Sequence, residues 1–389
     1  MSFDDHITAA LLATERAGLL RTPRTIETRQ GPTARIDGRD VVLLCSNNYL
    51  GHADHPALQA ALSSGVQHWG AGAAASRLVS GTMPPHRAAE RALADYVDLP
   101  SALLFSSGYA ANLGALQALV GPGDLILSDA LNHASVIDGC RLSRAHVEVY
   151  RHGDLDHAAA LLRQHRSGAR ACLIVTDAIF SMDGDLAPVA ALRRLADEHD
   201  AGLLVDEAHS LGIVGPAGAG LCAAAGIRPD ALVGTLGKAL GLGGAFVAGP
   251  ATTVRWIENR ARSFVFSTAL APALAAAIPD AVSIVRQDSH GRTTLTSHAG
   301  RLRQALRHLG LTIPESPSPI IPVVLGEPSV AMRASARLLE LGVFVHGIRP
   351  PTVPSGTARL RVVPIATHSD AHLDQAIDAL TTVLREVHP

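Results

Sequence analysis

The chain has 389 residues, of which 47% are hydrophobic and 17% are charged, and its formal net charge is −2. This composition supports a large buried core, and the small net charge argues against a nucleic-acid partner or an anionic membrane surface. No apolar run reaches the ~18 residues that a membrane-spanning helix needs, so we expect no membrane association either.

The first residues and the cysteines indicate a cytoplasmic protein. Acidic residues follow Met1, where a secretory signal peptide carries basic ones. The four cysteines are far apart and form no Cys-x-x-Cys pair, which is typical of reduced thiols in the cytosol: Cys45, Cys140, Cys172 and Cys222. The 19 histidines show no recognisable metal-site spacing, so we expect no metal.

Helical periodicity dominates the first hundred residues. Apolar residues recur at helical spacing in three segments and alternate in a short one, which predicts helices at 4–20, 55–69 and 84–97 and strands within 34–44. We expect residues 1–44 to form an N-terminal segment of a helix and short strands. A loop of Gly, Ala and Ser follows the second helix at 70–76.

Strands and helices alternate from residue 102 onward. The apolar runs predict strands at 102–105, 124–128, 147–150, 171–176, 202–205, 231–235 and 244–248. Helices are predicted between them at 108–120, 133–143, 156–166 and 188–198. This order predicts an α/β fold with right-handed βαβ units and a mainly parallel sheet. Ligands bind such sheets at the carboxyl ends of the strands.

The last hundred residues have a different pattern. A more polar helix is expected from 280 to 309 with a break at Gly291, and it is followed by strands at 320–325 and 342–345 and helices at 330–341 and 371–387. We therefore expect a large domain over residues 45–282 and a small C-terminal α+β domain over residues 283–389.

Two strand ends carry an unusual set of polar residues. The strand Leu203–Val205 ends in Asp206, with His209 three residues further, and the strand that ends in Thr235 is followed by Lys238. Lys238 is the only lysine in the chain. Pyridoxal 5'-phosphate (PLP) needs an amine for its Schiff base, an anion for its ring nitrogen and a hydroxyl for its phosphate. We predict that Lys238 carries PLP covalently, that Asp206 pairs with the ring nitrogen, and that His209 reaches the 3'-oxygen.

Other residues suit the phosphate and the ring of this cofactor. Gly108 and Tyr109 open a predicted helix, where backbone amides bind phosphate. Thr235 supplies a hydroxyl, and Ser267 with Thr268 could add more from a neighbouring subunit. His133 stands at a strand-to-helix junction and could stack on the ring, although a lone histidine there is more often a helix cap.

Together these motifs make the chain resemble the α-oxoamine synthases, a family of fold-type I PLP-dependent transferases. The matching segments are 46–51, 76–82, 105–109, 132–135, 180–185 and 206–212, with Thr235 and Lys238. The resemblance implies a homodimer whose active site lies at the subunit interface. It also implies that Ser181 contacts the cofactor and that the catalytic set is Lys238, Asp206, His209 and His133.

The segment 349–361 is similar to that of the biotin-pathway branch of this family. This likeness implies condensation of L-alanine with a pimeloyl thioester, bound to CoA or to a carrier protein, to give 8-amino-7-oxononanoate, CO2 and free thiol. It implies that Asn47 and Arg361 hold the carboxylate of the amino acid, an arrangement that an arginine fork suits well. The other substrate contacts it implies are Arg21, His133, Arg349 and Thr352.

Three alternatives stay open at this point. A glycine C-acetyltransferase or a serine palmitoyltransferase-like enzyme belongs to the same family, and a non-catalytic regulatory subunit with the PLP fold belongs to another class. A regulatory subunit should lack the lysine, whereas Lys238 is present. The chain departs from the family at Ala73–Ala75, where the family tends to carry Gly or Thr, and this puts the side-chain selectivity of the pocket in doubt.

Overall fold

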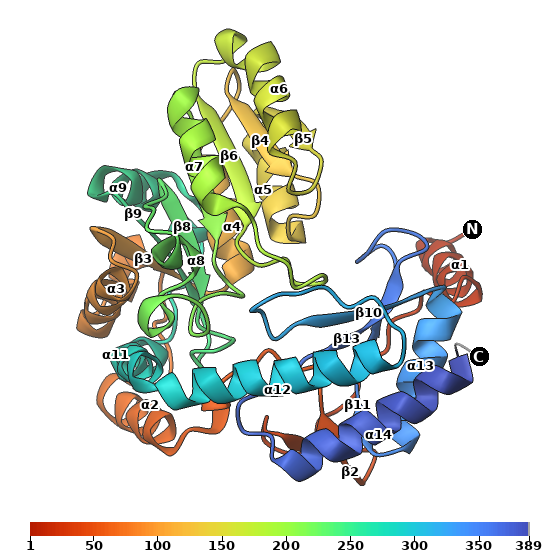
Figure 1. The fold of residues 1–389 in the computed structure, drawn as a ribbon. Helices are drawn as coiled ribbons and strands as arrows, with labels where there is room; N and C mark the ends of the chain where they lie inside the picture. The colour runs from red at the N-terminus through yellow and green to blue at the C-terminus, as the bar shows by residue number, and fades with distance from the viewer. Residues whose placement is uncertain (388–389) are drawn as a thin grey trace.

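A seven-stranded sheet lies at the centre of the larger domain of the computed structural model, which describes residues 1–387 (Figure 1). Its strands lie in the order β3 (Ser101–Phe105), β9 (Ala245–Gly249), β8 (Ala231–Thr235), β7 (Gly202–Asp206), β6 (Cys172–Asp177), β4 (Leu125–Asp129) and β5 (His146–Tyr150). The strands from β8 to β5 are parallel, whereas β9 runs antiparallel to both of its neighbours. The predicted mainly parallel α/β sheet is confirmed.

Helices cover both faces of this sheet. One face packs against α4 (Gly108–Leu119), α5 (Ala134–Ser143), α9 (Ala251–Arg260) and α10 (Arg262–Val265). The other face packs against α6 (Leu155–His165), α7 (Val189–Glu198), α8 (Leu221–Ala224), α3 (Pro84–Tyr96) and α11 (Pro272–Gln287), with α2 (Pro56–Trp69) beside α11. In β4, Ile126 faces the first layer while Leu125 and Leu127 face the second, because side chains of a strand alternate between its faces.

The carboxyl ends of three neighbouring strands bring polar residues to one edge of the sheet. Asp177, Asp206 and Thr235 are the last residues of β6, β7 and β8. Asp177 and Asp206 also stand opposite each other in the β6–β7 register. These three strands are parallel and run in the same direction, so their last residues share the edge at which α/β sheets bind ligands.

The smaller domain is built on two three-stranded sheets. One contains β10 (Ile321–Gly326), β13 (Ala358–Val362) and β12 (His346–Ile348), and the other contains β1 (Thr33–Ile36), β2 (Arg39–Leu43) and β11 (Val343–Phe344). Their common core is closed by α12 (Ser289–His308), α13 (Pro328–Glu340) and α14 (Asp370–Val387). Figure 1 shows α12 running beneath β10 and β13 from the side of α2 and α11. The hairpin of the N-terminal segment therefore shares a sheet with the C-terminal part of the chain.

The junction between the domains lies at Asp288. This residue separates α11 from α12, and its side chain caps α12 by accepting a hydrogen bond from the amide of Gly291 (2.7 Å). The predicted break at Gly291 is therefore wrong, because Gly291 lies in the first turn and Asp288 is the N-cap. The proposed limit of the large domain at residue 282 falls inside α11.

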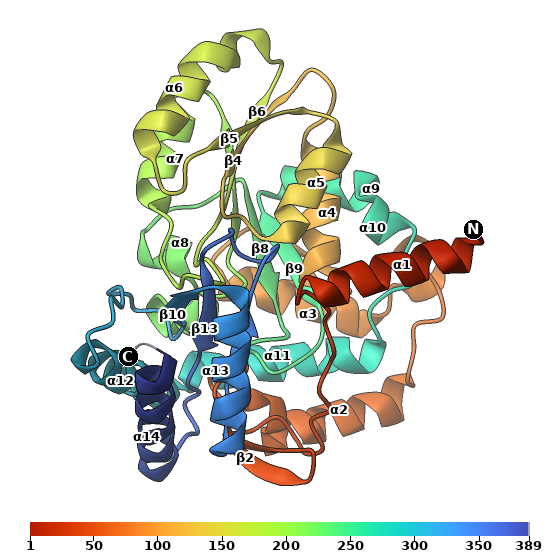
Figure 2. The same cartoon turned by 90° about the vertical axis from the view of Figure 1, so that its right-hand side faces the viewer.

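The N-terminal helix α1 (Phe3–Arg16) projects from the body of the molecule (Figure 2). It ends before the predicted residue 20 because Gly18 has a φ of 68°, a left-handed conformation that stops helices. None of its residues is buried, and apolar Ile7 and Leu11 are exposed. Short helical turns complete the chain: η1 (His52–Asp54), η2 (Arg77–Gly81), η3 (Arg166–Gly168) and η4 (Pro216–Gly218).

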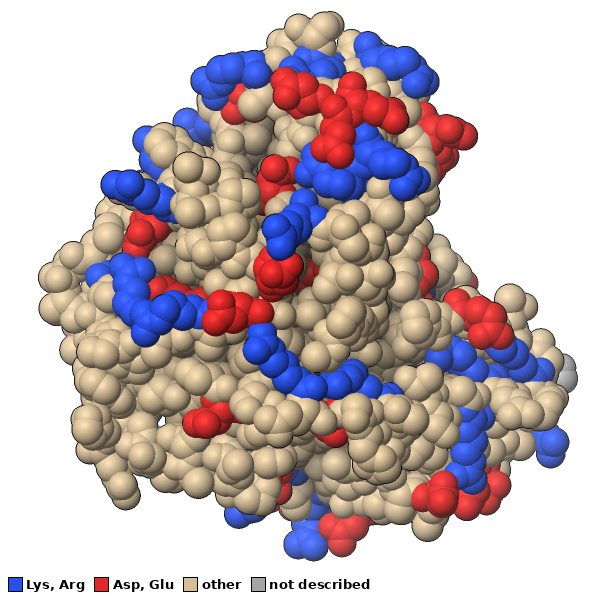
Figure 3. Space-filling model, turned by 60° about the vertical axis from the view of Figure 1, so that its left-hand side comes forward, with Lys and Arg blue, Asp and Glu red and all other residues tan. Residues whose placement is uncertain are grey.

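Charged side chains of both signs are present on the visible face of the molecule. Figure 3 shows acidic and basic side chains interspersed there, with no large area of one sign. Within residues 1–387, no helix combines the length and the apolar character needed to cross a membrane.

Candidate active site

A cleft of about 790 Å³ opens between the carboxyl edge of the large sheet and the small domain. Its walls combine turns that follow the large-domain strands with β12, β13 and the loop between them. Eight of the predicted site residues line this one cleft: Arg21, Asn47, His133, Ser181, His209, Lys238, Thr352 and Arg361. They come from segments more than three hundred residues apart in the sequence.

Lys238 lies in the turn that follows β8. The buried side chains of Leu236, Ala239 and Leu240 anchor this turn, so the lysine has a fixed place beside the cleft. Its Nζ lies 2.9 Å from Nε2 of His209. Burial lowers the pKa of Lys238 from 10.5 to about 8, although the nearby carboxylates of Asp206 and Asp177 act in the opposite direction. A free amine is therefore present at near-neutral pH.

His209 follows β7 and bonds through both of its ring nitrogens. Nδ1 lies 2.7 Å from the hydroxyl of Tyr49, and Nε2 faces Lys238. Burial lowers the pKa of His209 well below its usual value, and the positive charges of Lys238 and Arg361 lower it further. The imidazole is therefore neutral, and its two nitrogens differ in role, since one carries hydrogen and the other a lone pair.

Asp206 is held at the end of β7 by two donors. Oδ2 accepts from Nδ2 of Asn112 (2.6 Å) and Oδ1 accepts from the amide of Ala208 (2.9 Å). Asp177 lies beside it on β6, where burial first and then the charge of Asp206 raise its pKa well above the usual value. Among residues 1–387, Oδ1 of Asp177 and Oδ1 of Asn112 are buried without a hydrogen-bond partner. The fixed side chain of Asp206 therefore lies next to a buried carboxyl, that of Asp177, whose pKa is raised.

His133 caps the start of α5 with its side chain. Its Nδ1 accepts from the amide of Ser135 (3.2 Å) and also lies 2.7 Å from the Ser135 hydroxyl. This leaves Nε2 as the ring nitrogen that can meet a ligand in the cleft. The histidine is therefore a helix cap and a cleft-lining residue at once.

Arg361 is a buried cation that lines the same cleft as Lys238. It lies on β13 and donates from Nε to the carbonyl of Ser181 (2.5 Å) and from Nη2 to Oδ1 of Asn47 (3.1 Å). No carboxylate within residues 1–387 forms an ion pair with it. An unpaired buried guanidinium is costly, so the arrangement suits an anionic ligand.

A second group of predicted residues lies next to the cleft rather than on its wall. A Cβ built on Gly108 would lie 3.9 Å from Cβ of Thr235, so the start of α4 and the Thr235 hydroxyl meet at one place. The first amides of any helix lack partners inside it, so this junction, here called the cradle, combines backbone donors with a hydroxyl. The Tyr109 side chain itself is turned toward Asp138, to which its hydroxyl donates.

Three predicted residues are not brought to the cleft of this chain. Ser267 and Thr268 line a separate small cavity with Ser106. Arg349 is buried in a neighbouring cavity, where its Nη2 donates to the carbonyl of Leu20 (2.6 Å) and fastens the N-terminal segment. Arg21 and Thr352, by contrast, meet at the cleft rim, with Nη2 lying 3.3 Å from the threonine hydroxyl.

The arrangement of this chain matches a known family over nearly its whole length. A family model described as aminotransferase class I and II matches residues 39–380. The chain belongs to the aminotransferase class I and II family. Among its relatives, an 8-amino-7-oxononanoate synthase of Anaeromyxobacter dehalogenans strain 2CP-1 is 49% identical and covers 99% of this chain and 97% of its own. Another, from Geobacter sulfurreducens, is 48% identical over 95% of both chains.

Solved structures of this family have the same fold. Serine palmitoyltransferase from S. paucimobilis with bound PLP-myriocin aldimine superposes with a TM-score of 0.93, at 31% identity over 98% of each chain. An 8-amino-7-oxononanoate synthase from Francisella tularensis superposes with a TM-score of 0.77, at 25% identity over 90% of this chain and 99% of that one. The predicted resemblance to α-oxoamine synthases of fold type I is confirmed by these relatives.

Three residues that bond to or lie beside the predicted site residues were not predicted from the sequence. Tyr49 binds His209, Asn112 binds Asp206, and Asp177 lies beside Asp206. Tyr49 stands inside the matching segment 46–51, so its place in that motif was the available signal. Asp177 directly follows a predicted strand, as Asp206 does, whereas nothing in the helical pattern distinguishes Asn112.

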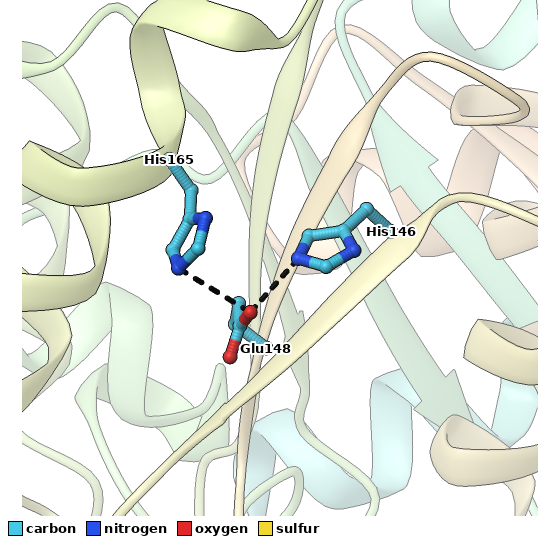
Figure 4. Close-up of side chains that lie close together, drawn as sticks. All are labelled: His146, Glu148 and His165. Carbon is cyan, nitrogen blue, oxygen red and sulfur yellow. Dashed lines mark hydrogen bonds and ion pairs between the residues drawn. The ribbon is translucent and has the colours of Figure 1, made fainter.

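A cluster of possible metal ligands lies outside the cleft, at the edge strand β5. His146 and His165 both approach Oε1 of Glu148, at 2.8 and 3.4 Å from their Nε2 atoms (Figure 4). The three groups satisfy one another and are all accessible to water. The cluster is therefore explained as a surface hydrogen-bonded group, and the absence of a metal stays a prediction.

Proposed function

We propose that this enzyme condenses L-alanine with a pimeloyl thioester to give 8-amino-7-oxononanoate, CO2 and free thiol, with PLP as its cofactor. The observation that carries the proposal is one cleft that is lined both by the only lysine of the chain and by Arg361, a guanidinium with no ion-pair partner among residues 1–387. The names of the relatives that are 48–49% identical support the choice of substrates.

The residues of the cleft fit PLP. Lys238 would hold it covalently, Asp206 would face its ring nitrogen, and His133, His209 and Ser181 would surround the ring and its 3'-oxygen. The cradle of Gly108, Tyr109 and Thr235 would take the phosphate, as helix starts do in many proteins. When bound, PLP supplies an imine carbon for the amino acid and a ring that accepts the electrons released at its α-carbon.

The protein contributes positioning and proton transfer. Arg361 and Asn47 would bind the carboxylate of alanine through charged and neutral hydrogen bonds. The Lys238 amine would take the proton from the α-carbon and later return one, because its lowered pKa provides a free base near neutral pH. Asp206 would stabilise the positive ring nitrogen by its negative charge, and the two histidines would fix the orientation of the ring.

The lowered pKa of Lys238 predicts how fast the cofactor-free protein captures PLP at each pH. Only the neutral amine attacks, so the rate constant is expected to rise about tenfold per pH unit below the pKa and to level off above about pH 8. Stopped-flow absorbance over pH 6 to 10 measures it. A rate constant that still rises tenfold per pH unit between about pH 8 and the end of this range, as for an amine with the ordinary lysine pKa of 10.5, would show that the amine is not desolvated.

Arg361→Lys is expected to weaken alanine binding while leaving the acyl donor unaffected. A lysine cannot keep both the bond to the Ser181 carbonyl and the fork toward a carboxylate. We expect the KM for L-alanine to rise about 10- to 100-fold, since bonds to charged groups contribute about 1.5–3 kcal/mol. Steady-state kinetics with each substrate varied in turn measures this split.

Arg359→Lys is the matched control for that variant. Arg359 is a buried arginine on the same strand, but it pairs with Asp183 and does not line the cleft. Its replacement should leave the KM for alanine within about twofold of wild type. An equal rise of the KM for alanine in both variants would show that the substitutions act by disturbing β13 and not through a contact in the cleft.

A serine palmitoyltransferase-like activity is the second candidate, because of the close superposition with that enzyme. The two are separated by thiol release with alanine, glycine and serine, each offered with pimeloyl-, acetyl- and palmitoyl-CoA. The proposal predicts the highest kcat/KM for alanine with the pimeloyl thioester. A preference for serine with palmitoyl-CoA, or for glycine with acetyl-CoA, would overturn it.

We also propose that two copies form a homodimer in the cytoplasm, with the active site at their interface. Exposed apolar side chains support an interface near Ser267 and Thr268: Phe266 is 71% exposed and Val79 is 81% exposed. Such exposed apolar groups mark protein contacts. Sedimentation is expected to give twice the mass of 40.4 kDa, and a monomer with full activity would contradict the proposal.

A further inference from the structure

A chain of hydrogen bonds leads from Lys238 into the core, and the protonation state of Lys238 sets its direction. While Lys238 is protonated it can only donate, so Nε2 of His209 then accepts across their 2.9 Å separation and Nδ1 carries the ring hydrogen. Nδ1 then donates to the hydroxyl of Tyr49 at 2.7 Å. The Tyr49 hydroxyl in turn donates to Oδ1 of Asn47 at 3.3 Å, which also accepts from Arg361 at 3.1 Å.

Tyr49 occupies this place with little freedom. Its side chain is fully buried, and it packs in the main core cluster of the large domain. Burial raises the pKa of Tyr49 above 10, so the phenol keeps its hydrogen. It is the partner of Nδ1, the ring nitrogen that faces away from Lys238.

We propose that Tyr49 is a positioning residue, which in the cofactor-free protein holds the His209 imidazole in the tautomer whose Nε2 lone pair faces the Lys238 amine. The inference rests on the proposed role of Lys238 as the proton-transfer group. Whenever Lys238 is protonated, it needs an acceptor, and Nε2 is the atom placed to accept. If the hydrogen moved to Nε2, two donors would face each other at this distance.

The charges around Lys238 and His209 make the Nε2 acceptor important. The carboxylates of Asp206 and Asp177 favour the protonated lysine, whereas Arg361 opposes it. Around His209, the cations Lys238 and Arg361 and the ring of His133 all disfavour a positive imidazole. The histidine therefore cannot adapt by taking a second proton, and its tautomer is set by the partner of Nδ1.

The test is the titration of Lys238 in Tyr49→Phe. Because the chain has a single lysine, protein grown with ¹³Cε-labelled lysine gives one side-chain signal from the full-length, cofactor-free protein. In wild type the signal should titrate with a pKa of about 8. Phenylalanine cannot accept from Nδ1, so the ring hydrogen is no longer held there and Nε2 is no longer fixed as the acceptor of the Lys238 ammonium group. The midpoint of the lysine titration should therefore fall by about one pH unit, or about 1.4 kcal/mol.

Tyr96→Phe is the matched control. Tyr96 is also buried, and its hydroxyl donates to the carbonyl of Gly218 at 2.6 Å. It belongs neither to the chain of hydrogen bonds that starts at Lys238 nor to the wall of the cleft. Loss of the Tyr96 hydroxyl should leave the titration of Lys238 unchanged. An unshifted midpoint in Tyr49→Phe, or equal shifts in both variants, would overturn the proposal.

Two further measurements separate this proposal from other outcomes. The ring ¹⁵N signals of wild-type His209, assigned by their loss in His209→Gln, should show hydrogen on Nδ1, and hydrogen on Nε2 would overturn the proposal without any variant of Tyr49. The low-pH limb of kcat for the PLP-loaded Tyr49→Phe enzyme should move in the same direction as the titration. Since the lysine titration needs no turnover, a wild-type protein without synthase activity would defeat the proposed function and leave this test intact.

Discussion

Replacement of Lys238 by alanine is expected to abolish covalent PLP binding and to lower the rate by more than about 10⁴-fold, because in the proposed mechanism one amine serves both as anchor and as proton-transfer group. The chain has no other lysine that could substitute. Borohydride reduction followed by peptide mass spectrometry measures the result directly. Wild-type protein should carry the mass of reduced PLP on the peptide that contains Lys238, and the variant should carry none.

Lys238→Arg is the control that keeps the positive charge. Arginine preserves the attraction to Asp206 and Asp177, but it stays protonated and forms no imine. It should therefore bind PLP without a covalent bond and be as inactive as the alanine variant. A labelled peptide or a residual rate near wild type in either variant would remove Lys238 from its proposed place.

Asp206→Asn is expected to have the second largest effect, a loss of about 10²- to 10³-fold in kcat together with weaker PLP binding. Asp206 now accepts from both Asn112 and Ala208. An asparagine can accept at only one of its two side-chain atoms, so one donor would face another. Losing one partner of a buried charge pair costs about 3–5 kcal/mol.

Two quantities are measured for Asp206→Asn: the dissociation constant of PLP and the single-turnover rate. Asp124→Asn serves as control, because Asp124 is a buried aspartate that pairs with Arg170 and precedes β4, at the strand end opposite the cleft. We expect the control to bind PLP normally. Wild-type affinity and rate in Asp206→Asn would show that the cofactor ring nitrogen has another partner.

The central sheet and much of the cleft could be predicted from the sequence because both depend on local patterns. Each parallel strand is a short apolar run, and the polar residue that ends it must lie at the ligand-binding edge, as Asp206 and Thr235 do. The strand β13 was not predicted, because it has no continuous apolar run. Arg359 and Arg361 alternate with apolar residues, yet all five residues are buried, because the arginine face lines the site and its surroundings.

Contacts between distant segments could not be predicted from local patterns. Tyr49 and His209 are 160 residues apart, and Asn112 and Asp206 are 94 residues apart. Only the packing of helix and loop onto the strand ends brings them together. Arg349 shows the reverse case, since its motif indicated substrate binding while its guanidinium bonds to the backbone of Leu20.

The three alanines at Ala73–Ala75, where the family tends to carry Gly or Thr, also have a structural consequence that the sequence pattern did not reveal. Ala74 has a φ of 56°, in the left-handed region that glycine adopts at no cost. The loop then pairs with the segment of Thr268 through the bridge at Ser76. The alanine is therefore accommodated at a cost of about 1 kcal/mol in a loop next to the proposed interface.

The central claim is the decarboxylative condensation itself, and the stoichiometry of one reaction tests it most directly. The PLP-loaded enzyme is given [1-¹³C]L-alanine and pimeloyl-CoA, and free thiol, ¹³CO2 and amino ketone are measured together by absorbance and mass spectrometry. The account predicts equal amounts of all three, with an unlabelled product of the mass of 8-amino-7-oxononanoate. Thiol release without ¹³CO2, or a product that keeps the label, would contradict it.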